Sequence, residues 1–325
     1  KYNTWERVRM ALDELGPTFI KFGQIMADRP DIIPEPLRVE LSRLQDKAEP
    51  MSDDLAIKAI EKELKIPLMQ VFREFDCMNI ASASIAQVYR ATLQTGEEVC
   101  VKIQRPDIDQ KIELDLHLME YFAGRMQKNN PEMEAIDVLG VVKEFGKTIR
   151  KELDFRHEAA NVVRFRHNFE GNPDVYVPKV YMEYTTGKVI VEEYITGIKI
   201  NDTDALIQAG NDPVVVARKA VRTIFDMIFN HGFFHADPHP GNIFVLDNNV
   251  LTFVDFGMMG SLREEQLLFL GKYALGYIQR DAHSMTEALL LVSGKRHFRE
   301  KRELEFQIGE MMAHYRYLPI EEMDF

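Results

Sequence analysis

The chain has 325 residues, of which 46% are hydrophobic and 28% charged, a composition typical of a soluble globular protein with one large domain or two smaller ones. Its net charge of −12 argues against non-specific nucleic-acid binding, so no nucleic-acid partner is expected. The only cysteines, Cys77 and Cys100, exclude a disulfide framework and favour a reducing compartment.

Helices are predicted for residues 1–65. Apolar residues repeat at helical spacing until Gly16-Pro17 breaks the pattern, and Ser52-Asp53-Asp54 is a start signal for a later helix over Leu55–Leu64. Lys21 and Gln24 lie three positions apart between these segments, so on a helix they would share a face. The pattern alone favours a solvated face for this pair.

The segment Phe75–Lys102 has the pattern of strand, loop, strand, turn and strand, with Lys102 inside the last strand. In a kinase-like lobe the loop covers the nucleotide phosphates and the lysine reaches them. Here the loop has alanine where glycine is usual, and alanine cannot adopt a positive φ cheaply, so the cradle for phosphates should be altered. The expected nucleotide-binding residues of this loop are Ala81, Ser82, Ala83, Ser84, Ile85, Ala86, Gln87 and Val88.

Two long helices are predicted for residues 107–169, the first over Ile108–Lys128 and the second from Ala135 onward. The second helix carries three acids, Glu152, Asp154 and Glu158. A kinase fold needs a helix-borne glutamate to hold the strand lysine. Spacing leaves the choice between Glu152 and Glu158 open, although Asp154 and Glu158 would share a face.

A hairpin is predicted from Val175–Tyr181 and Lys188–Tyr194, and its second strand runs into a linker. Backbone groups near Glu193 and Ile195 are candidates for binding adenine, because an interlobe hinge would lie there. From Asp202 onward the pattern is helical again.

A second hairpin is predicted where the apolar runs Ile243–Leu246 and Val250–Val254 flank a polar turn. Asp237 and Asn242 precede the first run, and Asp255 opens an Asp-Phe-Gly sequence after the second. The hairpin thus brings three polar side chains to its open end, an arrangement typical of a kinase active centre.

The chemistry of phosphoryl transfer explains these residue types. Catalysis relies on positioning and charge neutralisation, so Asp237 suits the orientation of an acceptor hydroxyl or water and Lys102 suits the phosphates. Mg²⁺ prefers hard oxygen ligands, which Asn242 and Asp255 supply. After Asp-Phe-Gly the chain passes directly to a helix near Leu262–Ile278, without Ala-Pro-Glu, so the usual platform for a peptide substrate is missing.

Together these residues resemble the UbiB/AarF family of atypical kinases, protein-kinase-like proteins linked to ubiquinone (coenzyme Q) biosynthesis. The resemblance covers nearly the whole chain. Lys-x-Gly-Gln and Glu-x-Asp are specific to the family, whereas the His-x-Asp-x-His-Pro-Gly-Asn loop is shared with aminoglycoside and choline phosphotransferases. The motifs are Lys21-Phe22-Gly23-Gln24, the alanine-rich loop, Val101-Lys102, Glu152-Leu153-Asp154, the loop 235–242 and Asp255-Phe256-Gly257.

The resemblance implies an α+β, bilobal protein-kinase-like fold with an N-terminal helical extension. We expect the extension over residues 1–70, an N-lobe with inserted long helices over 71–195, and a C-lobe over 196–325. The resemblance also implies Mg²⁺-dependent binding of ATP or ADP, and ATPase or atypical kinase activity. Ala86 departs from the glycine of many members, which bears on nucleotide preference.

In the family, the Lys-x-Gly-Gln and Glu-x-Asp motifs meet where a protein substrate would otherwise bind. Lys21 and Gln24 are therefore expected to point into the active cleft and to block protein substrates. A lysine in a partly desolvated cleft needs an acidic partner, for which Glu152 is the first choice and Asp154 the second.

The resemblance further implies a role in prenyl-quinone lipid metabolism at a membrane, with membrane lipid, quinone precursors and quinone-biosynthesis proteins as partners. No apolar run approaches the ~20 residues of a transmembrane helix. The sequence starts at Lys1 without Met, so we expect a fragment. We expect it in the cytosol or on the mitochondrial matrix side, peripheral to a membrane or anchored by segments outside the fragment.

Two other hypotheses remain open. A small-molecule phosphotransferase is favoured by the shared loop and the missing peptide platform, although the extension with Lys21 and Gln24 argues against it. A nucleotide-gated lipid-binding protein with little turnover is the second, and turnover measured with and without lipid separates it from an ATPase.

Overall fold

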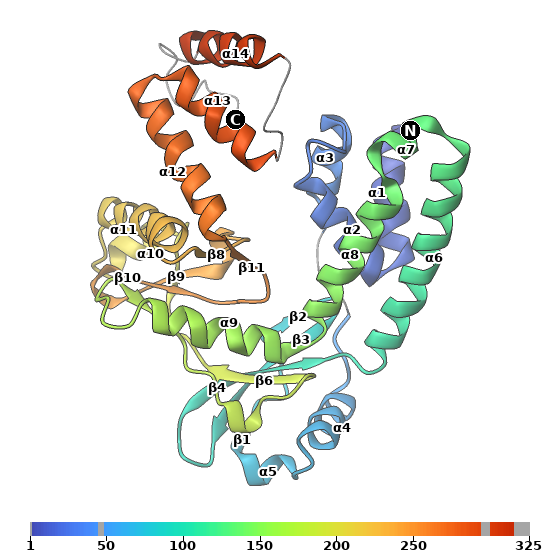
Figure 1. Cartoon of the computed structure of the whole chain (residues 1–325). Coiled ribbons are helices and arrows are strands. Elements are labelled where there is room, and N and C mark those ends of the chain that lie inside the picture. Colours follow the sequence, from blue (N-terminus) through green and yellow to red (C-terminus); the bar gives the residue numbers. More distant parts are fainter. Residues whose placement is uncertain (1, 45–48, 294–299, 315–325) are drawn as a thin grey trace. The chain divides into compact units, whose positions relative to one another are not determined.

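The computed structural model of the chain describes residues 2–44, 49–293 and 300–314 (Figure 1). The last residues of the expected C-lobe, 315–325, lie outside the described residues. The chain divides into two compact units. Unit 1 comprises Lys1–Gly171, Tyr176–Gly197 and Thr252–Gly257, and unit 2 comprises Asn172–Val175, Ile198–Leu251 and Met258–Phe325.

The helices predicted at the N-terminal end of unit 1 are confirmed. They are α1 (Thr4–Leu15), α2 (Pro17–Ala27), α3 (Glu35–Leu41) and α4 (Asp53–Leu64). Asn3 caps α1 by accepting a hydrogen bond from the Glu6 backbone, and the break at Gly16 follows from its positive φ of 100° and the proline that starts α2. A small core of apolar side chains, including Ile20, Met26 and Leu41, joins α2 to α3.

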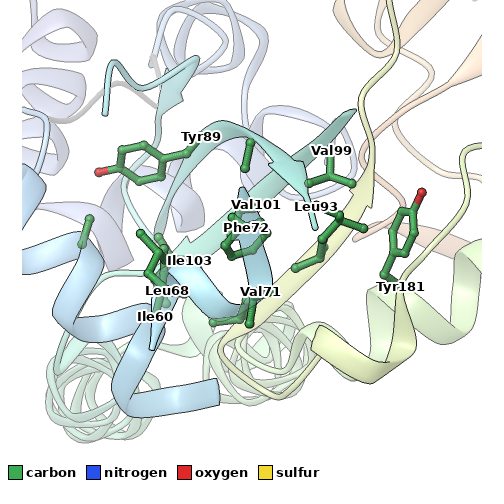
Figure 2. Packing of buried hydrophobic residues seen from close by; sticks show 14 of the residues in the cluster. Ile60, Leu68, Val71, Phe72, Tyr89, Leu93, Val99, Val101, Ile103 and Tyr181 are labelled. Atoms are coloured by element: carbon green, nitrogen blue, oxygen red, sulfur yellow. The ribbon is translucent and has the colours of Figure 1, made fainter. Parts of the chain in front are cut away.

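The main sheet of unit 1 follows the short helix α5 (Leu68–Val71) and has the order β1-β3-β4-β6, with β2 paired to β3. Its strands are β1 (Phe72–Phe75), β2 (Ala81–Ser82), β3 (Ala86–Leu93), β4 (Glu98–Gln104) and β6 (Val189–Glu193). One face buries alternate side chains against α4 and α5, as period-two alternation requires. Figure 2 illustrates this core, which includes Ile60, Phe72, Tyr89 and Val101.

The region after β4 contains more helices than predicted. The first long helix is confirmed as α6 (Ile108–Asn129). The prediction of one continuous second helix is wrong. The helices that follow α6 are α7 (Pro131–Ile136), α8 (Val138–Glu152) and α9 (Phe155–Asn168). The break falls at Leu153-Asp154, because the Asp154 carboxylate accepts from the Arg156 backbone and caps α9. Glu152 therefore ends one helix, whereas Glu158 belongs to the next.

The predicted hairpin of 175–181 with 188–194 is also only partly correct. The strand β5 (Val175–Tyr176) pairs with β10 in another sheet, whose order is β5-β10-β9-β7. A single bridge between Val180 and Glu192 remains of the predicted pairing, and the 3-10 turn η1 (Met182–Tyr184) lies between the two segments. Strand β7 is Ile198–Lys199.

The second hairpin is present as predicted. Its strands are β9 (Ile243–Leu246) and β10 (Val250–Phe253), joined by the turn η4 (Asp247–Asn249). Strand β8 (Phe233–His235) pairs antiparallel with β11 (Met259–Ser261), and η3 (Pro240–Asn242) leads into β9. The remaining elements are α10 (Thr203–Gln208), α11 (Pro213–Phe225), the π-helix η2 (Asp226–Asn230), α12 (Glu264–Gln279), α13 (Ala282–Val292) and α14 (Lys301–His314). Among the residues described, none of the helices has both the length and the apolar character needed to cross a membrane.

Candidate active site

An ion pair joins Lys102 on β4 to Glu158 on α9 within unit 1. The ammonium nitrogen is 3.1 and 3.0 Å from the two carboxylate oxygens, and the Glu158 side chain is only 5% exposed. Helix α9 presents Glu158 on the face that also buries Phe155, Ala159 and Val162. The partner of Lys102 that spacing could not identify is therefore Glu158.

Asp255 lies on the open side of this pair. One of its carboxylate oxygens is 3.7 Å from the Lys102 nitrogen, and the side chain is about half exposed. Its φ of 61° is in the left-handed region, an uncommon conformation that aspartate and asparagine tolerate better than most residues. The next residue, Phe256, is buried against Phe165, and its carbonyl accepts a hydrogen bond of 2.9 Å from Asn161. Helix α9 thus holds both Glu158 and the Asp-Phe-Gly segment.

The charges of this cluster shift one another. Burial lowers the pKa of Lys102, but the carboxylates of Asp255 and Glu158 outweigh burial and keep that pKa above its ordinary value. Burial raises the pKa of Glu158, a rise that Lys102 opposes. Burial also raises the pKa of Glu192 on β6 to about 8, and the negative charge of Glu158 adds to this effect. The lysine stays charged at neutral pH, and several acids compete for it.

The expected ion pair of Lys21 with Glu152 is present in the structure, with an N–O distance of 2.5 Å and both side chains mostly buried. Gln24 makes a different contact, since its amide donates to the Leu44 carbonyl at 3.3 Å. Asp154, the second choice for Lys21, instead caps α9 and binds the Arg156 guanidinium at 2.7 and 2.8 Å. The Lys-x-Gly-Gln helix α2 is thereby tied to the end of α8.

The alanine-rich loop is bound by Arg105, a residue that sequence reasoning missed. The Arg105 guanidinium donates to the Ala83 carbonyl at 2.9 Å and to the Ser82 hydroxyl at 2.8 Å. The Ala83 amide donates within the loop to the Ala86 carbonyl at 2.9 Å, so this amide already has a partner. The Ile85 side chain anchors the loop in the core formed by α6 and α8. No local sequence signal distinguishes Arg105 from an ordinary arginine after a strand.

The loop also binds the segment before α4. Gln87 is buried, and its side-chain oxygen accepts a hydrogen bond of 2.8 Å from the Met51 backbone. Val88 lies opposite Lys102 in the β3–β4 register, and Gln87 lies opposite Ile103. Because directly opposed side chains point to the same face, Val88 lies on the Lys102 side of the sheet.

Unit 2 holds the other two polar residues of the predicted active centre. Asp237 is exposed, and its backbone amide donates to the ring of the buried His235 at 3.2 Å. The Asn242 side-chain amide donates to the Asp237 carbonyl at 3.3 Å, which closes the loop between β8 and β9. The role of His235 in positioning the Asp237 backbone was not foreseen, although His-x-Asp at the end of a strand is the signal that could have indicated it.

The hinge candidates follow β6. The Tyr194 amide donates to the Glu98 carbonyl on β4 at 3.0 Å, and the Glu193 amide donates to the Lys179 carbonyl at 2.8 Å on the other side of the strand. Backbone groups alternate sides along an extended strand, so those of Glu193, the last residue of β6, turn away from β4. Among the described residues no group accepts a hydrogen bond from the Ile195 amide.

The residues that are candidates for a metal fit Mg²⁺ in kind. Both offer hard oxygen donors, a carboxylate from Asp255 and an amide oxygen from Asn242, whose nitrogen already donates to the Asp237 carbonyl. The half-exposed Asp255 carboxylate is accessible to solvent.

Comparison with known proteins identifies relatives over most of the chain. The profile of the ABC1 atypical kinase-like domain matches residues 43–289. The "Probable protein kinase UbiB" of Marinobacter nauticus is 40% identical over 291 residues, which are 88% of this chain and 53% of that protein. An uncharacterised protein of Synechocystis is 39% identical over 282 residues, 87% of this chain and 50% of that protein. The chain spans about half the length of the curated relatives it matches.

A solved structure has a similar fold. The Rv3197 protein of Mycobacterium tuberculosis, described in complex with erythromycin, has a TM-score of 0.65 and 26% identity, covering 94% of this chain and 78% of that one. The α+β kinase-like fold expected from the sequence is therefore confirmed.

Proposed function

The chain belongs to the ABC1 atypical kinase-like family, and from this premise we propose that it is a Mg²⁺-dependent ATPase or unorthodox kinase that binds adenine nucleotide and supports ubiquinone or other prenyl-quinone biosynthesis. The family supports kinase-like chemistry, whereas the activity of the whole protein is part of the proposal, because the chain spans only about half of its relatives. The observation that carries the proposal is the Lys102–Glu158 pair with Asp255 at 3.7 Å from the lysine.

Each residue has a role in this proposal. Lys102, oriented by Glu158, contacts the nucleotide phosphates, and the alanine-rich loop covers them. Asp237 orients the attacking hydroxyl or water. Asn242 and Asp255 hold Mg²⁺, which when bound neutralises charge on the phosphate oxygens. Backbone groups of Glu193 and Ile195 bind the adenine.

The N-terminal extension is proposed to exclude protein substrates. Support comes from the Lys21–Glu152 pair, which fixes α2 beside the end of α8. Only Leu153 and Asp154 separate this end from α9, the helix that carries Glu158. The Thr18 hydroxyl adds a hydrogen bond of 2.5 Å to Asp115 on α6. These two contacts support the proposal that α2 acts as a fixed cover, because both must break before the helix moves.

The proposed lipid partner is a quinone precursor with a prenyl chain. An apolar cavity of about 380 Å³ supports this choice, since ligand pockets of this size bind small hydrophobic molecules. The side chains of Phe122, Leu118 and Met126 on α6 are about half exposed at this cavity, and the lining includes Leu15, Phe19, Phe22, Met119, Ala123, Val138 and Val142. Membrane lipid, quinone-biosynthesis proteins and a membrane-peripheral location in a reducing compartment complete the proposal.

The test is nucleotide hydrolysis and Mg-nucleotide binding by wild type and Asp255→Asn, each with and without anionic lipid vesicles carrying a quinone-precursor mimic. Asparagine tolerates the left-handed backbone of Asp255, so the variant should fold while losing a charged metal ligand. We expect Mg-dependent ATP affinity to fall by about tenfold or more, the equivalent of one strong contact.

Asp247→Asn is the matched control, because Asp247 is an exposed residue in the turn at the other end of the same hairpin. Undiminished Mg-nucleotide affinity in Asp255→Asn would reject the metal assignment. Tight nucleotide binding without hydrolysis under any lipid condition would instead favour a nucleotide-gated lipid-binding protein.

A further inference from the structure

Glu192, which the roles above leave unused, lies on the same face of the sheet as Lys102. In the antiparallel register of β4 and β6, Cys100 is opposite Glu192 and Lys102 is opposite Ile190. Opposed residues point to the same face and alternate along each strand, so all four side chains lie on one side of the sheet. Their neighbours along the two strands face the hydrophobic core on the other side, namely Val99, Val101 and Val191.

The surroundings of the Glu192 carboxyl are partly enclosed and charged. Burial is the main cause of its raised pKa, and the carboxylates of Glu158 and Asp255 add to the rise. The Lys102 charge lowers this pKa and so opposes them. Within the part of the chain that the structure describes, Glu192 forms no ion pair and no side-chain hydrogen bond. Lys102 is already bonded to both oxygens of Glu158. Once ionised, a half-buried carboxylate without a donor is costly, so the site then favours a ligand that supplies one.

The position of Glu192 relative to the hinge indicates which part of a ligand it would meet. The backbone groups of Glu193 turn away from β4, and those of Glu193 and Ile195 are the groups proposed to bind a base. A carbonyl at Glu193 selects a donor on the base, and an amide at Ile195 selects an acceptor. Adenine offers both groups, since its 6-amino group is a donor and its N1 is an acceptor. Bound in this way, adenine would have its 6-position nearest to Glu192, the strand residue before Glu193.

We propose that Glu192, in its ionised form, determines the base specificity of the nucleotide site, by accepting a hydrogen bond from the 6-amino group of adenine and repelling the 6-oxygen of guanine. This inference rests on the proposed function, because it requires a nucleotide at the Lys102 site. The amino group has two protons, so it can donate to the Glu193 carbonyl and to the Glu192 carboxylate together. Guanine has a carbonyl oxygen at position 6, so an acceptor would face the acceptor oxygens of the Glu192 carboxylate.

The experiment measures binding of Mg-ATP and Mg-GTP by calorimetry at pH 9, where the Glu192 carboxyl is mostly ionised. Glu192→Gln keeps the size of the side chain but can donate to guanine as well as accept from adenine. We expect the ATP-to-GTP affinity ratio to fall by about 10-fold or more, as for loss of one hydrogen bond to a charged group. Glu98→Gln is the matched control, since it removes an exposed carboxyl from the same sheet face and should leave the ratio unchanged.

A second measurement, on wild type at the same pH, requires no variant. Inosine triphosphate carries oxygen at the 6-position without the 2-amino group of guanine, and purine riboside triphosphate carries hydrogen there. We expect ATP to bind most tightly and inosine triphosphate most weakly. An unchanged ratio in Glu192→Gln, or equal binding of ATP and inosine triphosphate, would overturn this inference and leave the proposed function intact. Wild type that binds none of these nucleotides would overturn both.

Discussion

The Lys102 ammonium donates hydrogen bonds to both carboxylate oxygens of Glu158, at 3.1 and 3.0 Å, across 56 positions of sequence. The contact joins the central strand β4 to α9 and is mostly shielded from solvent on the glutamate side. The same lysine is the proposed phosphate ligand. Stability and nucleotide binding therefore depend on one pair of side chains, and the two effects can be separated by substitution.

Glu158→Gln should destabilise the protein by about 3 kcal/mol, because it leaves the Lys102 charge half-paired in a partly buried site. The combined variant Lys102→Met with Glu158→Leu should recover much of that loss, since no unpaired charge remains. Neither variant should bind Mg-nucleotide. Chemical denaturation measures the first effect and calorimetry the second. The exposed pair of Lys147 and Glu144 is the control, and Glu144→Gln should cost less than about 0.5 kcal/mol.

The stability of the metal-free protein should fall as pH rises toward 8. In the folded protein the pKa of Glu192 is raised to about 8, whereas in the unfolded chain a glutamate has the ordinary pKa of 4.5 and loses its proton at lower pH. Between these pH values the folded state binds more protons than the unfolded state, so ionisation of Glu192 opposes folding. Glu192→Gln removes this penalty and should be stabilised relative to wild type by about 1–2 kcal/mol at pH 8.

At pH 5 the same variant should have nearly wild-type stability, because Glu192 is then protonated in the folded protein. Urea denaturation at pH 5 and pH 8 in the presence of a chelator measures the difference. Glu98→Gln serves as the control, since the Glu98 side chain is half exposed and pairs with Arg90 at the surface. A stability difference between Glu192→Gln and wild type that does not change with pH would contradict this account.

Much of the fold could be predicted because its signals are local. The apolar periods of α1, α4 and α6 and the polar turn of the β9–β10 hairpin lie within single segments of sequence. The pairing of β5 with β10 could not be foreseen in this way. Val175 and Tyr176 have the residue types of a strand, but nothing in a two-residue strand identifies a partner that is 75 positions away.

The site was predicted in part for the same reason. Lys102, Asp237 and Asp255 stand in recognisable motifs, whereas the partner of Lys102 depends on where a helix ends. Asp154 breaks the predicted helix and caps α9, which redirects Glu158 toward β4 and leaves Glu152 on α8. Arg105 carries no motif, and its role follows only from the three-dimensional approach of the end of β4 to the alanine-rich loop.

Gly23 of the Lys-x-Gly-Gln motif is predicted to be a packing residue. A Cβ atom there would lie 2.4 Å from the Leu44 side chain and 3.2 Å from Leu12, so Gly23→Ala forces these buried or partly buried side chains to move in the core around α2. We expect a loss of about 1–3 kcal/mol in the free energy of unfolding, as for other overpacked sites. Gly124→Ala is the control, because a Cβ atom on that residue of α6 meets nothing within 4 Å. The control should instead stabilise the protein by about 0.5–1 kcal/mol, and equal effects of the two substitutions would refute close packing at Gly23.

The alanine-rich loop is predicted to restrain ATP binding relative to ADP. The Ala83 amide donates within the loop and its carbonyl binds Arg105, so neither group is turned toward a ligand. Ala83→Gly widens the accessible backbone conformations and should raise ATP affinity relative to ADP by roughly threefold. Arg105→Gln should act in the same direction by releasing the loop, whereas Arg73→Gln on the exposed edge strand β1 should not.

Titration with Mg-ATP and Mg-ADP measures this preference. Ala81→Gly is the companion variant at the start of β2, where the residue pairs with Val88. If the ratio of the two affinities is the same in both alanine variants as in wild type, the loop has a structural role alone.

The pair of Lys21 and Glu152 is predicted to hold the extension over the site. Lys21→Met leaves the Glu152 carboxylate without its cation, and one oxygen of that carboxylate is already buried without a hydrogen-bond partner among the described residues. The variant should lose about 1–3 kcal/mol of stability but remain folded. With the cover loosened, autophosphorylation should rise several-fold, measured by transfer of radiolabelled phosphate from ATP.

The combined variant Lys21→Met with Glu152→Gln distinguishes loss of the cover from a purely electrostatic effect. Glu152 also raises the pKa of Glu158, so an unpaired Glu152 charge could weaken the hold of Glu158 on Lys102. Removing both charges restores stability in either case. If the pair acts as a latch, autophosphorylation stays high in the combined variant, because the contact between α2 and α8 is still broken. If the effect passes through Glu158, the rate of autophosphorylation in the combined variant returns to that of wild type. Rates equal to wild type in both variants would reject gating, even though the ion pair is present.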